Sequence, residues 1–179
     1  MEVKNEIKDT TYIKLIEYAS KKCDTVMFVT VPWHYKRAER REQEAILKNT
    51  TDIFERELKK DFLKKRDDGQ WVFTIEESGV PGASDHGFGI YFYKFSDTLT
   101  DFLLTNKNLY EWNNPYYPQD ISLFKNGYCW LYSIADEDMC FIYCENEEEY
   151  EYLKSIGVEF SKTEFVPTPK KDLYFEKYW

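Results

Sequence analysis

Two apolar runs, ISLFK and YCWLYSI, flank the dipeptide Asn126–Gly127. This arrangement is the strongest short-range signal for a β-hairpin, because Asn-Gly suits the tight turns that match the twist of paired strands. The acidic triplet Asp136–Asp138 makes a second tight connection, into the apolar run MCFIYC. The three runs therefore predict an antiparallel β-meander, with strands near residues 120–125, 128–135 and 139–144.

The first half of the chain alternates helical and strand patterns. Amphipathic spacing predicts helices near residues 10–22 and 38–66. Between them, the run CDTVMFVTV, from Cys23 to Val31, is rich in β-branched residues and predicts a buried strand. Two more strands are expected near 71–76 and 88–95, joined by a loop of Ser, Gly, Pro and Asp.

Two further helices have recognisable starts. Ser96 is expected to cap a short helix that runs through Leu104. Asn146, followed three residues later by Glu149, is close to a capping box for a helix from Glu147 to Ser155. Helices and antiparallel strands in separate stretches predict an α+β fold.

The length of 179 residues fits one domain with a single hydrophobic core. No segment reads as a linker long enough to separate two domains, so we expect a single α+β domain over residues 1–179. The tail 167–179, which follows Pro167 and Pro169, is expected either to dock by its aromatic residues or to stay mobile.

The charge balance limits the partners that this chain is expected to bind. With 24 basic and 33 acidic residues, the formal net charge is -9, which disfavours direct binding to nucleic acid or to an anionic membrane. No run of about 18 apolar residues exists, so no segment is expected to span a bilayer. The polar start MEVKNEIKDTTY lacks the apolar core of a secretory signal. We therefore expect a cytoplasmic protein.

The four cysteines are Cys23, Cys129, Cys140 and Cys144. Cys140 and Cys144 are four residues apart on a predicted strand, about 13 Å along it, which is too far for one metal ion to bridge. Free cysteine is commonly a small buried hydrophobe, so reduced core thiols are the favoured interpretation. Neither a metal site nor a cofactor is predicted.

Acidic residues are concentrated between Ile134 and Glu151, where no Lys or Arg is present. The acids are Asp136, Glu137, Asp138, Glu145, Glu147, Glu148, Glu149 and Glu151. Acids in the first turn of a helix complement its dipole, but this does not account for the triplet at 136–138. A field of one sign speeds association with a basic partner, whereas the alternative is a solvated acidic face without a partner.

Aromatic side chains near the acidic run are candidate anchors. Aromatic residues make up 18% of the chain, and Tyr and Trp are the usual anchors of interfaces. In NPYYP, two prolines are expected to hold Tyr116 and Tyr117 extended and exposed. The residues predicted to bind the partner are Asp136, Glu137, Asp138, Glu147 and Glu148 by charge, with Trp112, Tyr116 and Tyr117 as anchors.

The sequence contains no recognised catalytic constellation. Together with the clustered acids and the surplus of Tyr and Trp, this favours a non-enzymatic protein that binds and inhibits a macromolecular partner, expected to be a basic protein. An immunity protein or a phage-encoded inhibitor of a host defence acts in this way.

Two alternatives stay open. The first is a small anionic-ligand binder or enzyme, with a nucleotide or metabolite held near His34, Arg37, Arg41 and His86. His34 precedes a long helical pattern, and His86 lies in the Gly-rich loop GVPGASDHGFG, where close approach of a ligand is feasible. The second alternative is a homodimer formed by exposed aromatic residues, without a ligand.

The segment from Pro118 to Phe160 resembles the C-terminal half of small uncharacterised proteins of the Bacillus and Clostridium group, many of which are labelled as stage III sporulation proteins. The shared pattern is a Pro-x-Asp-Ile/Leu turn, here Pro118 to Ile121, that leads into a hairpin. Asp136–Glu137 stands where that pattern has a His-Glu pair, so no role of that histidine carries over. The resemblance covers about a quarter of the chain and implies no activity.

Overall fold

A computed structural model describes residues 1–30, 41, 44–46, 48, 56–66, 89–113 and 116–167. The strand predicted near 71–76 and the tail beyond residue 167 lie outside these described residues. So do most of the positions between 31 and 55.

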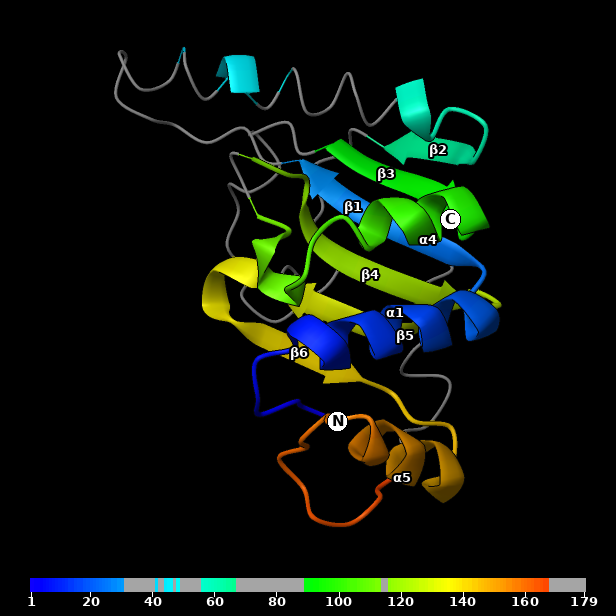
Figure 1. Cartoon of the computed structure of the whole chain (residues 1–179). Coiled ribbons are helices and arrows are strands. Elements are labelled where there is room, and N and C mark those ends of the chain that lie inside the picture. The colour runs from blue at the N-terminus through cyan, green and yellow to red at the C-terminus, as the bar shows by residue number, and fades with distance from the viewer. Residues whose placement is uncertain are drawn as a thin grey trace, which may run out of the picture.

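Six antiparallel strands form one sheet, with the order β2-β3-β1-β4-β5-β6. Their bounds are Thr25–Thr30 (β1), Phe62–Arg66 (β2), Gly89–Lys94 (β3), Gln119–Lys125 (β4), Tyr128–Ile134 (β5) and Met139–Ile142 (β6). Helices accompany the sheet, which confirms the predicted α+β class (Figure 1). β4, β5 and β6 form the predicted meander, whereas β1 lies between β3 and β4 and interrupts it.

The turn between β4 and β5 confirms the hairpin that the sequence predicts. Asn126 and Gly127 have φ angles of 50° and 79°. Two successive positive φ angles characterise the type I′ turn, which Asn-Gly adopts at little steric cost. This turn sets the register that places Lys125 opposite Tyr128, and an irregularity between Leu123 and Phe124 shifts the pairing by one residue beyond it.

The core lies between the sheet and two helices that cover the same face, α1 (Asp9–Lys22) and α4 (Asp97–Leu103) (Figure 1). α1 buries Tyr12, Leu15, Ile16 and Ala19, which recur at helical spacing. Ser96 caps α4, since its hydroxyl accepts the Leu99 N–H at 3.2 Å. Both α1 and α4 therefore pack their apolar side against the sheet.

The predicted helix over 38–66 is wrong at its C-terminal end. Residues 41, 44–46, 48, 56 and 57 are helical, but residues 62–66 form the edge strand β2. Cross-strand contacts outweigh the helical pattern here. The Phe62 ring lies 5.7 Å from that of Tyr93, and Lys65 Nζ lies 5.2 Å from the ring of Tyr91.

α5 (Glu147–Ser155) begins at the cap that the sequence predicts. Asn146 Oδ1 accepts the Glu149 N–H at 2.9 Å. The reciprocal bond of a capping box is shifted by one residue, because Glu149 Oε2 accepts the N–H of Glu145 rather than that of Asn146. Gly157, with a φ of 104°, follows the helix end.

A buried ion pair joins α1 and α5 to the sheet. Lys22 Nζ, on α1, lies 2.6 Å from Glu149 Oε1, and the Glu149 side chain is only 2% exposed. The same oxygen accepts the indole N–H of Trp130 on β5 at 2.9 Å. Burial opposes the charge of Lys22, but its bonds to Glu149 outweigh burial and raise the pKa of Lys22.

Removing the carboxylate of this pair tests its importance. Glu149→Ala removes one of the two carboxylates beside the part-buried Lys22 ammonium group and leaves the buried Trp130 indole N–H without its acceptor, so we expect a loss of about 2–4 kcal/mol in the free energy of unfolding. Glu148→Ala, at the exposed neighbouring position, should change it by no more than about 0.5 kcal/mol. Urea denaturation at pH 7 measures both values. A loss below about 1 kcal/mol for Glu149→Ala would show that the pair is dispensable.

Candidate functional site

Three of the eight clustered acids are neutralised within the protein. Glu145 Oε2 lies 2.8 Å from Lys125 Nζ and 3.2 Å from Lys22 Nζ. Glu149 forms the buried pair with Lys22, and Glu151 pairs with a lysine one turn along its own helix. The lysines that neutralise Glu145 and Glu149 come from α1 and β4, so the acidic run by itself did not reveal these pairs.

The other five acids are Asp136, Glu137, Asp138, Glu147 and Glu148. All five are exposed, and none forms an ion pair with another residue in the part of the chain that the structure describes. They form two groups. The first three belong to the short helix η3 (Ala135–Glu137) and its C-cap before β6, while the other two begin α5 beyond the far end of β6 (Figure 1). The single continuous face that the sequence suggested is therefore divided.

The predicted aromatic anchors have different environments. Tyr116 is 64% exposed, as the sequence predicts. Trp112 is fully buried, contrary to the expectation of an exposed anchor. Its indole N–H donates to Tyr12 Oη at 2.9 Å, and that hydroxyl donates to the Leu103 carbonyl at 2.9 Å. The half-buried ring of Tyr117 packs on Trp112 with centroids 5.2 Å apart, so Trp112 supports the surface from below.

Tyr110 lies at the same end of the molecule as the η3 acids. It belongs to the short helix η2 (Leu109–Glu111), which packs against η3. Burial raises the pKa of the Tyr110 hydroxyl, and the carboxylates of Asp138 and Glu6 add to this effect. We call the surface formed by Tyr110, Tyr116, Asp136, Glu137 and Asp138 the acidic end.

A buried carboxyl group lies beneath the acidic end. Asp120, at the start of β4, is 1% exposed, and its Oδ1 accepts the N–H of Ala135 at 2.7 Å. Burial raises the pKa of Asp120 to about 7, against the opposing effect of the Ala135 bond. The nearby charges of Asp136 and Glu137 raise it further. Sequence reasoning missed this residue, although one acid at the start of an apolar strand was a visible signal.

The alternative ligand site is not assembled in the described part of the molecule. His34, Arg37 and His86 lie outside the described residues. Arg41 is exposed on a helical segment. The small-ligand hypothesis therefore stays a prediction from the sequence.

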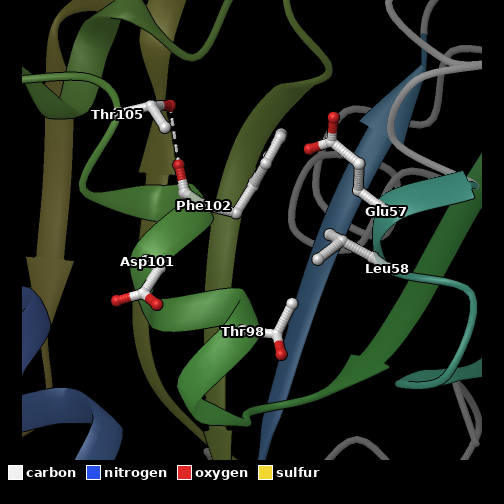
Figure 2. A pocket seen from close by; sticks show the side chains of 6 residues that line it. All are labelled: Glu57, Leu58, Thr98, Asp101, Phe102 and Thr105. Atoms are coloured by element: carbon white, nitrogen blue, oxygen red, sulfur yellow. Dashed lines mark hydrogen bonds between the residues drawn. The ribbon is translucent and has the colours of Figure 1, made fainter.

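A hollow of about 400 Å³ lies between α4 and the residues before β2. Its lining residues are Glu57, Leu58, Thr98, Asp101, Phe102 and Thr105 (Figure 2). Phe102 and Leu58 project into the space between the two segments, whereas Asp101 points to the other side of α4 (Figure 2). Thr105 Oγ1 donates to the Phe102 carbonyl at 2.7 Å. None of the described residues that line the hollow is basic, so this part of the chain supplies no cation there for an anionic ligand.

The cysteines are free and buried, as the sequence predicts. Burial raises the pKa of the Cys144 thiol to about 12, so the reactive thiolate is scarce at neutral pH. Within the described ranges, no group of three or more His, Cys, Asp or Glu side chains could hold a metal ion. A search of the described helices finds none that is long and apolar enough to cross a membrane.

Comparison of the chain with models of protein families, with curated proteins and with solved structures found no match. The resemblance of Pro118–Phe160 to the Bacillus and Clostridium group stays a prediction. The case for function depends on the residues of the acidic end.

Replacing the buried carboxyl group tests the environment of Asp120. The pKa of Asp120 in the folded protein, near 7, lies above that of an unfolded aspartate. The contribution of its protonated carboxyl group to stability is therefore complete below about pH 4 and is lost as the pH rises through about 7. Asp120→Asn keeps an oxygen for the Ala135 N–H and carries no charge. We expect the free energy of unfolding of the variant to equal that of the parent near pH 4 and to exceed it at pH 8 by on the order of 2–4 kcal/mol. Denaturant unfolding at several pH values measures this, and a difference that does not change with pH would contradict it.

Proposed function

We propose that the chain captures a basic macromolecular partner through the acidic end and neutralises it, as an immunity protein or a phage-encoded inhibitor of a host defence does. The observation that supports this proposal is the exposure of Asp136, Glu137 and Asp138, which form no ion pair with another described residue. The exposed Tyr116 precedes β4 at the same end of the sheet. Clustered charge of one sign steers an oppositely charged partner, and an exposed tyrosine supplies contact area.

The overall charge fits a protein partner better than nucleic acid or an anionic membrane. The formal net charge of -9 repels polyanions at long range, whereas it attracts a basic protein. The four unpaired thiols suit a reducing compartment, so we place the encounter in the cytoplasm. In this proposal the chain acts by occupying its partner and carries out no reaction of its own.

Two charge-matched variants separate the acidic end from the start of α5. The first combines Asp136→Asn with Glu137→Gln, and the second combines Glu147→Gln with Glu148→Gln. Each variant removes two negative charges from exposed positions, so both reduce the magnitude of the net negative charge of -9 by the same amount. Asp138 is left intact because its φ of 52° forms the left-handed C-cap of η3.

The parent and the two variants are each immobilised on a column and exposed to a lysate of the native host at low salt. The parent is also tested at high salt. We expect the parent to retain a basic protein at low salt and to lose it near 0.5 M salt, since screening weakens exposed charge pairs (~0.5 M gives a Debye length of roughly 4 Å). The η3 variant, Asp136→Asn with Glu137→Gln, should retain at least about fivefold less of this basic protein than the parent does. Its association rate with the purified basic protein should fall by about tenfold.

The α5 variant, Glu147→Gln with Glu148→Gln, should retain an amount of the basic protein within about twofold of that retained by the parent. Equal retention by the two variants would mean that general charge, rather than the acidic end, governs capture. Retention that survives both salt and the η3 substitutions would overturn the proposal. Light scattering of the free chain identifies the homodimer alternative, in which the exposed aromatic residues are occupied by a second copy.

A further inference from the structure

Asp120 occupies a β-bulge in the middle of the sheet. β1 pairs Val29 with Gln119 and Met27 with Ser122, so three steps along β4 lie opposite two steps along β1. Asp120 has a φ of 56°, in the left-handed region that side chains other than glycine seldom adopt. A bulge redirects the side chain at its centre, which explains how a residue of β4 reaches the start of η3.

The contacts of Asp120 join η2 and η3, the two short helices of the acidic end. Its carboxylate Oδ1 accepts the N–H of Ala135, the first residue of η3, at 2.7 Å. Its own N–H donates to the carbonyl of Trp112, the residue that follows η2, at 3.3 Å. The backbone pairing of β4 with β5 ends with Ser122 opposite Tyr132. Beyond this pair, the Asp120 carboxylate accepts the N–H of Ala135 in place of a backbone carbonyl.

The charge of Asp120 is not needed for these contacts. Asparagine would offer the same oxygen to Ala135 without the cost of burying a carboxylate. The groups that act on the carboxyl are Asp136 and Glu137 of η3, both negative, and the Gln119 amide, whose Nε2 lies 3.4 Å from Oδ2. Among the residues that the structure describes, no ion pair supplies a cation to this carboxyl group.

We propose that Asp120 is a positioning residue of the acidic end, and that its protonation couples capture of a cationic partner to pH. The inference rests on the proposed function, and it adds a regulatory property to the same surface. A cation bound beside Asp136 and Glu137 favours the ionised form of Asp120, because opposite charges attract through the poorly screened interior. Capture then releases a proton, and affinity rises with pH.

The size of the effect follows from linkage. The raised pKa of Asp120, about 7, means that this group changes its charge between about pH 6 and 8. Each unit by which the bound cation lowers that pKa gives about a tenfold gain in affinity between the acidic and the alkaline side of this range. A group that was only structural would give no such pH profile.

A decalysine peptide serves as a defined probe of the acidic end. Its affinity for the parent, Asp120→Asn and Asp120→Ala is measured by titration calorimetry from about pH 5.5 to 8.5 at constant low ionic strength. We expect the affinity of the parent to rise severalfold across this range and that of Asp120→Asn to stay flat. Asp120→Ala, which loses the bond to Ala135, should bind more weakly at every pH.

The asparagine variant is also the control for other titrating groups. His34, His86 and the amino terminus are present in all three proteins, so only the difference between parent and Asp120→Asn reports on Asp120. The same pH slope in both would overturn the coupling, while equal binding by the alanine and asparagine variants would overturn the positioning role.

Carbon NMR of the free parent follows the Asp120 carboxyl directly, together with the amide signals of Ala135 and Asp136. A midpoint near 7 in all three signals is expected, and a carboxyl that titrates below about pH 5 would overturn the coupling without involving any partner. Failure of decalysine to bind the parent at any pH, with the NMR midpoint near 7, would instead overturn the proposed function and the coupling to capture together.

Discussion

The buried pair between Lys22 and Glu149 is the interaction on which the arrangement of this molecule depends. One carboxylate receives the ammonium group of α1, the indole N–H of β5 and, through its second oxygen, the backbone N–H of Glu145. Three elements that are distant in the sequence therefore meet at a single charged group. Burying a carboxylate is costly unless it is paired and hydrogen-bonded, and the bonds to Lys22, Trp130 and Glu145 offset that cost.

Ion pairs with lysines of other elements also determine which of the clustered acids are neutralised. Because Glu145 and Glu149 are bound to lysines of α1 and β4, the charge near the start of α5 is partly neutralised. The η3 acids have no such partners among the described residues, and Tyr110 and Tyr116 lie at their end of the sheet. The asymmetry between the two ends of β6 is therefore a consequence of tertiary pairing, and it concentrates free negative charge at the acidic end.

Local signals predicted much of the fold. The Asn126–Gly127 turn, the Ser96 and Asn146 caps and the strands of the meander all depend on residues close together in the sequence. The insertion of β1 between β3 and β4 depends on long-range pairing, which no local pattern encodes. The same is true of residues 62–66, where cross-strand contacts replaced the expected helix.

The site was predicted less completely for a related reason. The exposed acids and Tyr116 could be named from composition and turn chemistry, because a tight connection between strands is usually exposed. The burial of Trp112 and the role of Asp120 could not, since both depend on the packing of η2 and η3 against β4. A count of acids along the chain likewise cannot reveal which of them meet lysines from other elements.

The measurement that tests the central claim most directly is an amide NMR titration of the labelled chain with decalysine at low salt and pH 8. The account predicts that the largest shift changes fall at residues 109–112, 116–117 and 135–139, the segments that form and support the acidic end. Equal or larger changes at residues 146–149, where the remaining two exposed acids lie, would contradict the claim that the acidic end is the principal surface for a basic partner.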